Sequence, residues 1–128
     1  MSNQEPVKIL LVEDDPFLAN IYEKKFAQAG FKLDKVGAAE PALDIISKNK
    51  PDLVLLDILL PGSLDGFAVL QKIKSSPTTE NILVIMLSNF SGTEEVKKAK
   101  KLGADDYIIK IELTPSEVVD KVKRILAK

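Results

Sequence analysis

Short runs of aliphatic residues recur along the chain, and each is followed by a segment in which apolar residues repeat three and four positions apart. The short runs have the length of strands, and the longer segments have the spacing of amphipathic helices. This alternation of strand and helix, five times over, is typical of an α/β domain in which helices cover both faces of a parallel sheet. The predicted strands are 8–12, 31–36, 53–56, 81–89 and 106–110, and the predicted helices begin near Pro16, Pro41, Gly66, Thr93 and Thr114.

The composition fits one domain with a sizeable core. The chain has 128 residues, of which 45% are hydrophobic, and a net charge of −1. We expect residues 1–6 to form a flexible tail and residues 7–128 to form a single domain. The balanced charge gives no basic field for direct nucleic-acid binding. The polar N-terminus lacks the features of a signal peptide and no apolar run approaches a membrane span, so we expect a cytoplasmic protein with no membrane contact.

The chain contains neither cysteine nor histidine. These absences exclude disulfides, thiolate metal sites and the commonest general base in enzymes. Any chemistry must therefore rest on carboxylates, hydroxyls or lysines.

Polar residues stand where the predicted strands end. Asp14 follows the first strand, Asp57 ends the aliphatic run of the third, and Ser88 and Lys110 end the fourth and fifth. In parallel sheets, ligands bind beyond the carboxyl ends of the strands. In one of the two common orders of such sheets, 2-1-3-4-5, these four strands would be consecutive neighbours about 4.8 Å apart, and their end residues would form a row. A charged Asp57 is tolerable at such a solvated end, although it would be costly inside the core.

Carboxylates gathered in this way repel one another, and one would retain a proton unless a cation compensates. Mg²⁺ is the natural cation, because it prefers oxygen ligands and leaves room for phosphate oxygens. Asp57 would then be a nucleophile toward phosphorus, and Ser88 and Lys110 would hold oxygens of the transferring group.

Four segments carry a family resemblance: "ILLVEDD", "LVLLDILLPGSLDG", "VIMLSN" and "GADDYIIK". Together, in this order and spacing, they resemble the receiver domain of bacterial two-component response regulators over essentially the whole chain. The resemblance implies a flavodoxin-like α/β fold with the strand order 2-1-3-4-5. It also implies that Asp57 takes a phosphoryl group from a partner histidine kinase or phosphotransfer protein, and that the domain then switches from an inactive to an active conformation.

The resemblance assigns a role to each site residue. Glu13 and Asp14 match the acidic pair that holds Mg²⁺, together with Asp57 and the backbone carbonyl of Leu59. Ser88 matches the hydroxyl residue that turns inward on phosphorylation, Lys110 matches the lysine that pairs with the phosphoryl group, and Tyr107 matches the aromatic switch residue.

Four positions depart from the usual family pattern. Three residues instead of two separate Pro61 from Asp65, Ser88 replaces the commoner threonine, and Asn89 stands where a small residue is usual. Ile111 stands where the family usually has a proline after a cis bond. Because a cis bond before a non-proline residue costs about 3–4 kcal/mol, we expect the Lys110–Ile111 peptide to be trans.

The expected downstream surface is formed by the fourth helix, the fifth strand and the fifth helix. A target protein or a second copy of the chain would bind there, without direct contact to nucleic acid. The charged residues that would pair across such a dimer are Asp105, Asp106, Lys121 and Arg124.

Two other functions are compatible with this architecture but not with the residues of this chain. A flavin carrier of the same architecture would cradle a phosphate after the first strand, but "EDDPF" would repel it. An aspartate-based phosphatase would carry a second aspartate two positions after Asp57, where this chain has Leu59. We therefore expect no enzyme beyond self-phosphorylation and slow self-dephosphorylation, since Leu59 and Phe90 cannot orient a water. The remaining alternative is a degenerate receiver that binds partners without being phosphorylated.

Overall fold

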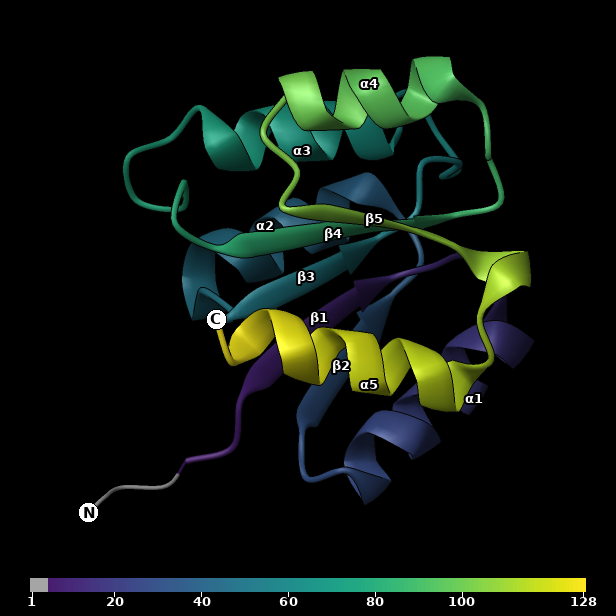
Figure 1. Cartoon of the computed structure of the whole chain (residues 1–128). Helices are drawn as coiled ribbons and strands as arrows, with labels where there is room; N and C mark the ends of the chain where they lie inside the picture. Colours follow the sequence, from purple (N-terminus) through teal and green to yellow (C-terminus); the bar gives the residue numbers. More distant parts are fainter. Residues whose placement is uncertain (1–4) are drawn as a thin grey trace.

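The structure is a computed structural model that describes residues 5–128. Five parallel strands form one sheet in the order β2-β1-β3-β4-β5, and five α-helices lie on its two faces (Figure 1). The predicted fold class and strand order are therefore confirmed. Residues 1–4 of the predicted tail lie outside the described residues. The strands are β1 (Lys8–Val12), β2 (Lys32–Val36), β3 (Leu53–Leu56), β4 (Leu83–Ser88) and β5 (Asp106–Ile109), and the helices are α1 (Pro16–Gln28), α2 (Ala39–Asn49), α3 (Gly66–Lys74), α4 (Thr93–Lys101) and α5 (Pro115–Leu126).

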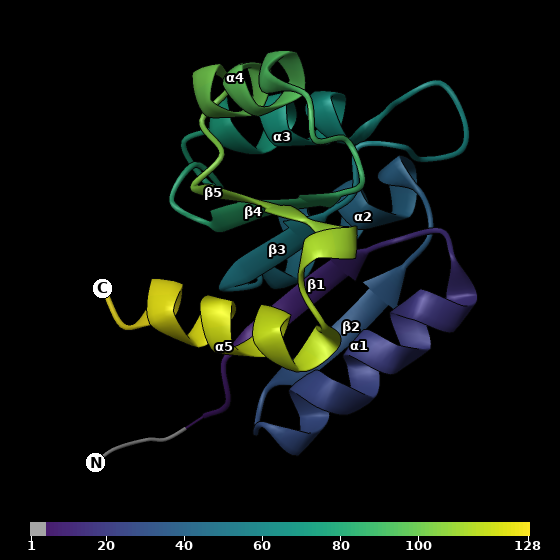
Figure 2. The ribbon, with the colours of Figure 1, turned by 45° about the vertical axis from the view of Figure 1, so that its right-hand side comes forward.

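Alternate residues of the central strands supply two separate cores. Leu10 and Val54 face α2, α3 and α4, whereas Leu11 and Leu55 face α1 and α5 (Figure 2). Both faces of β1 and β3 are buried, which explains why their sequences are continuous aliphatic runs. The weaker strand β2 lies at one edge of the sheet, as its alternating sequence predicts.

Local signals set the helix starts. The Asp15 carboxylate accepts hydrogen bonds from the first-turn amides of α1, and Asp65 accepts one from Ala68 in α3. Thr114 and Glu117 form a capping box at the start of α5. These caps place the helix starts beside the strand ends that carry the polar residues.

Three predicted strands are shorter in the structure. The strand expected at 31–36 is Lys32–Val36, the one expected at 81–89 is Leu83–Ser88, and the one expected to reach residue 110 ends at Ile109. Lys110 instead begins a short 3-10 turn, η1 (Lys110–Glu112), which turns the chain away from the sheet toward α5. The peptide bonds of the described chain are all trans, so the expected trans geometry at Ile111 is confirmed. Between residues 5 and 128, no helix combines the length and the apolar character that crossing a membrane requires.

Candidate functional site

The loop after β1 brings two acidic side chains to the carboxyl edge of the sheet. The Glu13 amide donates to the carbonyl of Val36 at 2.9 Å, so this residue continues the pairing of β1 with β2. The Asp15 amide donates to Glu13 Oε2 at 3.1 Å and holds the carboxylate inward. Glu13 is only 4% exposed, whereas Asp14 is exposed at the mouth of the site.

Asp57 is held at the next strand end by backbone bonds. Its amide donates to the carbonyl of Val12 at 3.1 Å, and the Leu59 amide lies 3.4 Å from Asp57 Oδ1. The loop then folds back, because the Gly66 amide donates to the carbonyl of Ile58 at 2.8 Å. Within this loop, Gly62 has a φ of 90°, a conformation that glycine adopts without steric cost. The longer loop therefore still returns to Asp57 and begins α3 beside it.

Lys110 lies between two of the carboxylates. Its Nζ is 2.7 Å from Asp57 Oδ2 and 2.5 Å from Glu13 Oε1. The contact with Asp57 is a hydrogen bond, and the contact with the buried Glu13 is an ion pair. Burial raises the pKa of Glu13 above 4.5, although Lys110 opposes this shift. Burial would lower the pKa of Lys110, but its contacts with Asp57 and Glu13 outweigh this effect and raise it.

The carboxylates suit a divalent cation. One oxygen from each of Glu13, Asp14 and Asp57 lies within 4.8 Å of the other two. Three carboxylates beside one ammonium group leave two negative charges, which one divalent ion would neutralise. Their carboxylate oxygens are hard donors of the kind that Mg²⁺ accepts. The residues present therefore fit Mg²⁺.

A small cavity of about 180 Å³ opens beside Asp57. Its lining combines the carboxylate with a hydroxyl, an ammonium group and two apolar side chains. Ser88 is 1% exposed, and its Oγ accepts a hydrogen bond from the Phe90 amide at 3.2 Å. The lining residues are Asp57, Leu59, Ser88, Asn89, Phe90 and Lys110.

Tyr107 is connected to this cavity through the loop after β4. Its hydroxyl donates to the carbonyl of Phe90 at 2.7 Å, and the Phe90 amide in turn donates to Ser88. Burial raises the pKa of Tyr107. Ser88 and Tyr107 are thus connected through Phe90, a residue for which the sequence predicted no part in the switch.

Comparison with known proteins decides the family. The response regulator receiver domain profile matches residues 9–123. The chain belongs to this family. It is 34% identical over 119 residues to sporulation initiation phosphotransferase F of Bacillus subtilis, covering 93% of both chains. It is 31% identical to a probable transcriptional regulator, ycf27, of Porphyridium aerugineum, with 94% of this chain and 48% of that protein aligned. The receiver thus spans about half the length of several curated relatives, such as ycf27.

Solved structures agree with this assignment. A response regulator from Chloroflexus aurantiacus superposes with a TM-score of 0.88 at 33% identity, over 97% of this receiver and 100% of that chain. The BeF3-activated DrrB receiver domain gives a TM-score of 0.84 at 30% identity, over the same shares of the two chains. Response regulator receivers interact with histidine kinases or phosphotransfer proteins and bind Mg²⁺ at an acidic pocket.

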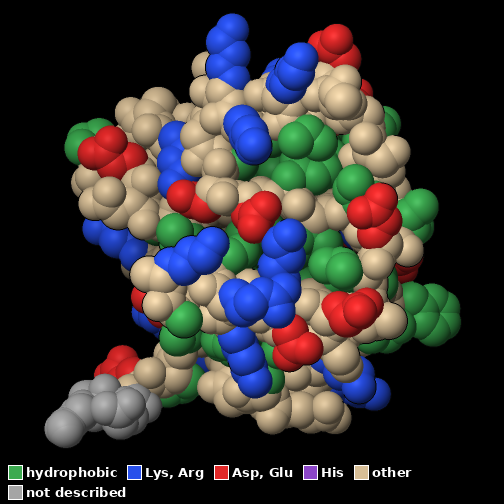
Figure 3. All heavy atoms as spheres, in the orientation of Figure 1, with side chains coloured by type: hydrophobic (Ala, Val, Ile, Leu, Met, Phe, Trp, Pro, Cys, Tyr) green, Lys and Arg blue, Asp and Glu red, His purple; other side chains and the backbone are tan. Residues whose placement is uncertain are grey.

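The receiver exposes large apolar side chains around this site. Phe17 is 82% exposed, Leu59 63% and Ile111 81%, and Ile21 and Phe90 are exposed to a smaller extent. Hydrophobic side chains project from the right-hand edge of the molecule in Figure 3, where the strands of Figure 1 end. Helical spacing alone would place Phe17 and Ile21 on the buried face of α1, but both side chains are exposed. They lie on the outer side of α1, which packs on the sheet through Ala19, Tyr22 and Phe26.

Three of the four proposed cross-dimer residues, Asp105, Asp106 and Lys121, have partners within the chain. Asp105 pairs with Lys74 at 3.1 Å and also accepts the Val84 amide at 2.8 Å. Asp106 lies 3.8 Å from Lys121. The sequence did not reveal these internal pairs, and pairing across a dimer stays a prediction.

Proposed function

We propose that the receiver accepts a phosphoryl group on Asp57 from a phosphohistidine of a histidine kinase or phosphotransfer protein. One observation carries this proposal: Asp57 borders a cavity with a buried hydroxyl, Ser88, and is bonded to the ammonium group of Lys110. A degenerate receiver would have no need to keep these three groups together. The chain is a substrate of the transfer and not a separate enzyme.

The transfer that we infer is an in-line displacement at phosphorus. A carboxylate oxygen of Asp57 forms the new bond to phosphorus, the phosphorus–nitrogen bond of phosphohistidine breaks, and its electron pair returns to the imidazole. Lys110 and the Ser88 hydroxyl donate to the phosphoryl oxygens, whose negative charge they stabilise. Glu13, Asp14, Asp57 and the Leu59 carbonyl would hold Mg²⁺, which when bound supplies positive charge against the carboxylates and the phosphoryl oxygens.

The switch would start at Ser88. For its hydroxyl to reach the phosphoryl group, its present bond with the Phe90 amide must break or lengthen. The carbonyl of Phe90 accepts a hydrogen bond from the Tyr107 hydroxyl, so movement of this loop would release Tyr107 as well. This route connects Asp57 with the α4, β5 and α5 surface, where a downstream protein or a second copy would bind.

The exposed apolar residues would contact the phosphohistidine donor. Phe17 and Ile111 come from segments that flank Asp57, and neither is covered within the described chain. An apolar rim of this kind marks a protein-binding surface. A small phosphodonor such as acetyl phosphate needs no such rim. The proposal therefore assigns donor binding to the exposed apolar residues and the transfer reaction to the residues around Asp57.

Beryllofluoride with Mg²⁺ tests the proposal, because it mimics a phosphorylated aspartate. We expect amide resonance shifts in 15N-labelled protein at Asp57, Ser88 and Tyr107, and a mass gain of one phosphoryl group with acetyl phosphate. Asp57→Asn should abolish both responses. Shifts or a mass gain that survive this substitution, or no response in the unsubstituted protein, would instead support the degenerate receiver.

A further inference from the structure

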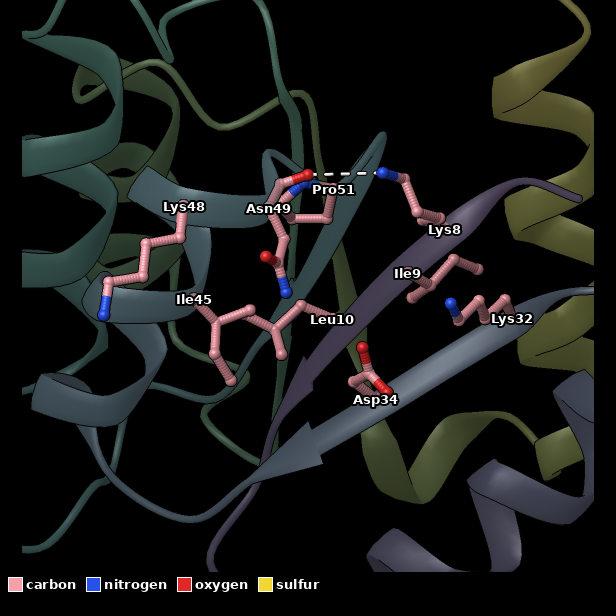
Figure 4. Close-up of a pocket in the computed structure, with 9 residues that line it drawn as sticks. All are labelled: Lys8, Ile9, Leu10, Lys32, Asp34, Ile45, Lys48, Asn49 and Pro51. Carbon is pink, nitrogen blue, oxygen red and sulfur yellow. Dashed lines mark hydrogen bonds between the residues drawn. The ribbon is translucent and has the colours of Figure 1, made fainter. Parts of the chain in front are cut away.

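A groove of about 440 Å³ lies at the opposite end of the sheet from Asp57. It is bounded by the first residues of β1 and β2 on one side and by the last turn of α2 on the other (Figure 4). The volume falls within the range of about 300–1,000 Å³ that is usual for small-molecule sites. The proposed phosphorylation makes no use of this groove.

The groove exists because α2 covers β1 and leaves the start of β2 open. Ile46 of α2 packs on Leu10 of β1 in the core, whereas Lys32 and Asp34 of β2 stand exposed on the same face. Leu10 and Pro51 are buried beneath the groove, and the half-buried Ile45 supplies its exposed apolar surface. A flat apolar group could lie against Ile45.

Two lysines are placed side by side at one end of the groove. Lys8 and Lys32 are register partners on neighbouring strands, so both side chains stand on the same face of the sheet. Like charges in this arrangement repel each other. Lys8 Nζ donates to the carbonyl of Asn49 at 3.3 Å, and the ammonium group of Lys32 has no ion-pair or hydrogen-bond partner within residues 5–128 (Figure 4). An anion shared between the two ammonium groups would relieve the repulsion and complete their hydrogen bonding.

Lys48 and Asp34, the other two charged residues that line the groove, restrict the kinds of ligand that it can bind. Lys48 pairs with Asp44 at 3.2 Å, so it contributes its aliphatic stem more than its charge. Asp34 is the register partner of Leu10, one step along the same face. Its carboxylate would repel a second phosphate but would accept hydrogen bonds from hydroxyl or amino groups.

We infer that this groove binds a phosphate monoester that carries a planar ring and hydroxyl groups, of the size of a nucleoside monophosphate. The phosphate lies between Lys8 and Lys32, the ring rests against Ile45, and the hydroxyl groups donate to Asp34. Triphosphates bind less tightly, because Lys8 and Lys32 hold one phosphate and the charge of Lys48 is already paired with Asp44. The inference does not depend on phosphorylation of Asp57.

Titration of adenosine 5′-monophosphate into 15N-labelled protein tests this inference. We expect saturable shifts at the amides of β1, β2 and the end of α2, weaker binding of adenosine, of inorganic phosphate and of the triphosphate, and an about tenfold loss of affinity in Lys32→Gln. Lys24→Gln removes an exposed lysine of α1 and is the matched control, which should bind as the unsubstituted protein does. Binding should also persist in Asp57→Asn.

The inference is overturned if no saturable shifts occur, or if they occur around Asp57 and vanish in Asp57→Asn. It is equally overturned if Lys24→Gln and Lys32→Gln lose the same affinity, because the nucleotide would then bind to positive charge in general. Amide spectra of each variant without ligand verify that it is folded, so that a loss of binding reports on the groove.

Discussion

Replacing Gly66 by alanine should both destabilise the receiver and disturb the proposed phosphoacceptor, Asp57. A Cβ at this position would lie 2.0 Å from the carbonyl oxygen of Asp57, whereas ordinary van der Waals contact begins at 3.4 Å. It would also lie 2.8 Å from the Cα of Ile58. These atoms belong to the backbone and cannot rotate away, so α3 and the end of β3 must separate by about 1.4 Å, which is the difference between the two oxygen distances.

Helix propensity alone favours the opposite outcome, because alanine in a helix is about 1 kcal/mol more favourable than glycine. Overpacking in a rigid interior typically costs about 1–3 kcal/mol and can cost more when backbone must move. Since the overlap here is with backbone on two residues, we expect a net loss of about 2–3 kcal/mol in the free energy of unfolding, or about 10 °C in Tm. Urea denaturation and thermal scans measure these quantities directly.

Gly37→Ala is the matched control. Its Cβ would meet Asp14 Cα at 3.7 Å and Glu13 O at 3.8 Å, which is ordinary contact, so we expect a change within about 1 kcal/mol. Well below its own Tm, Gly66→Ala should still accept beryllofluoride more weakly than Gly37→Ala does, because the Asp57 backbone is displaced. Equal stability of the two variants would show that the close approach of Gly66 does not constrain the site.

Three further predictions concern charge and water at the site. Burial raises the pKa of Glu13 above 4.5, so its ionised form destabilises the folded protein at neutral pH, and Glu13→Gln should raise the Tm measured in the presence of a chelator. The same substitution should weaken Mg²⁺ binding about 10- to 100-fold. A lower Tm in chelator would contradict the first expectation. Phosphorylated protein should lose its phosphate over times much longer than seconds, and Leu59→Asn should shorten that time if the apolar Leu59 and Phe90 exclude an oriented water; decay followed by mass spectrometry decides this. Burial raises the pKa of Tyr22, and the contacts of Lys110 with Asp57 and Glu13 raise the pKa of Lys110 despite its burial, so the unfolded chain releases both protons at lower pH than the folded chain does. The free energy of unfolding should therefore fall as the pH rises above about 10. A urea midpoint that does not fall, or one that falls as steeply in Tyr22→Phe, would refute the Tyr22 contribution.

The sequence predicted the sheet because its signals were local. Continuous aliphatic runs exist only where both faces of a strand are covered, and the runs at Leu53–Leu56 and Lys8–Val12 match β3 and β1 residue for residue. Caps at Asp15, Asp65 and Thr114 likewise depend on neighbouring residues. The strand order was implied by the family resemblance and not by these patterns.

The site residues were predictable as a set, but their pairing was not. Asp57 and Lys110 each follow the end of a predicted strand, so the sequence places both at the carboxyl edge of the sheet. The contact of Lys110 with Glu13 depends on side-chain directions, which the spacing of residues in the sequence does not give. The exposure of Phe17 could not be predicted from the sequence for a related reason. An apolar residue at helical spacing is assigned to the buried stripe by default, and only packing shows that the stripe of α1 runs through Tyr22 and Phe26.

The present hydrogen bonds indicate why the proposed switch could respond to one phosphoryl group. Lys110 already contacts Asp57, so its bond is exchanged on phosphorylation and not newly made. Ser88 and Tyr107, in contrast, each hold a neutral hydrogen bond to Phe90, and such a bond contributes about 0.5–1.5 kcal/mol. A bond from the Ser88 hydroxyl to a charged phosphoryl oxygen contributes about 1.5–3 kcal/mol. The gain at Ser88 therefore roughly equals the loss of both bonds to Phe90, and a balance this close lets one covalent change shift the population between the two arrangements of the loop.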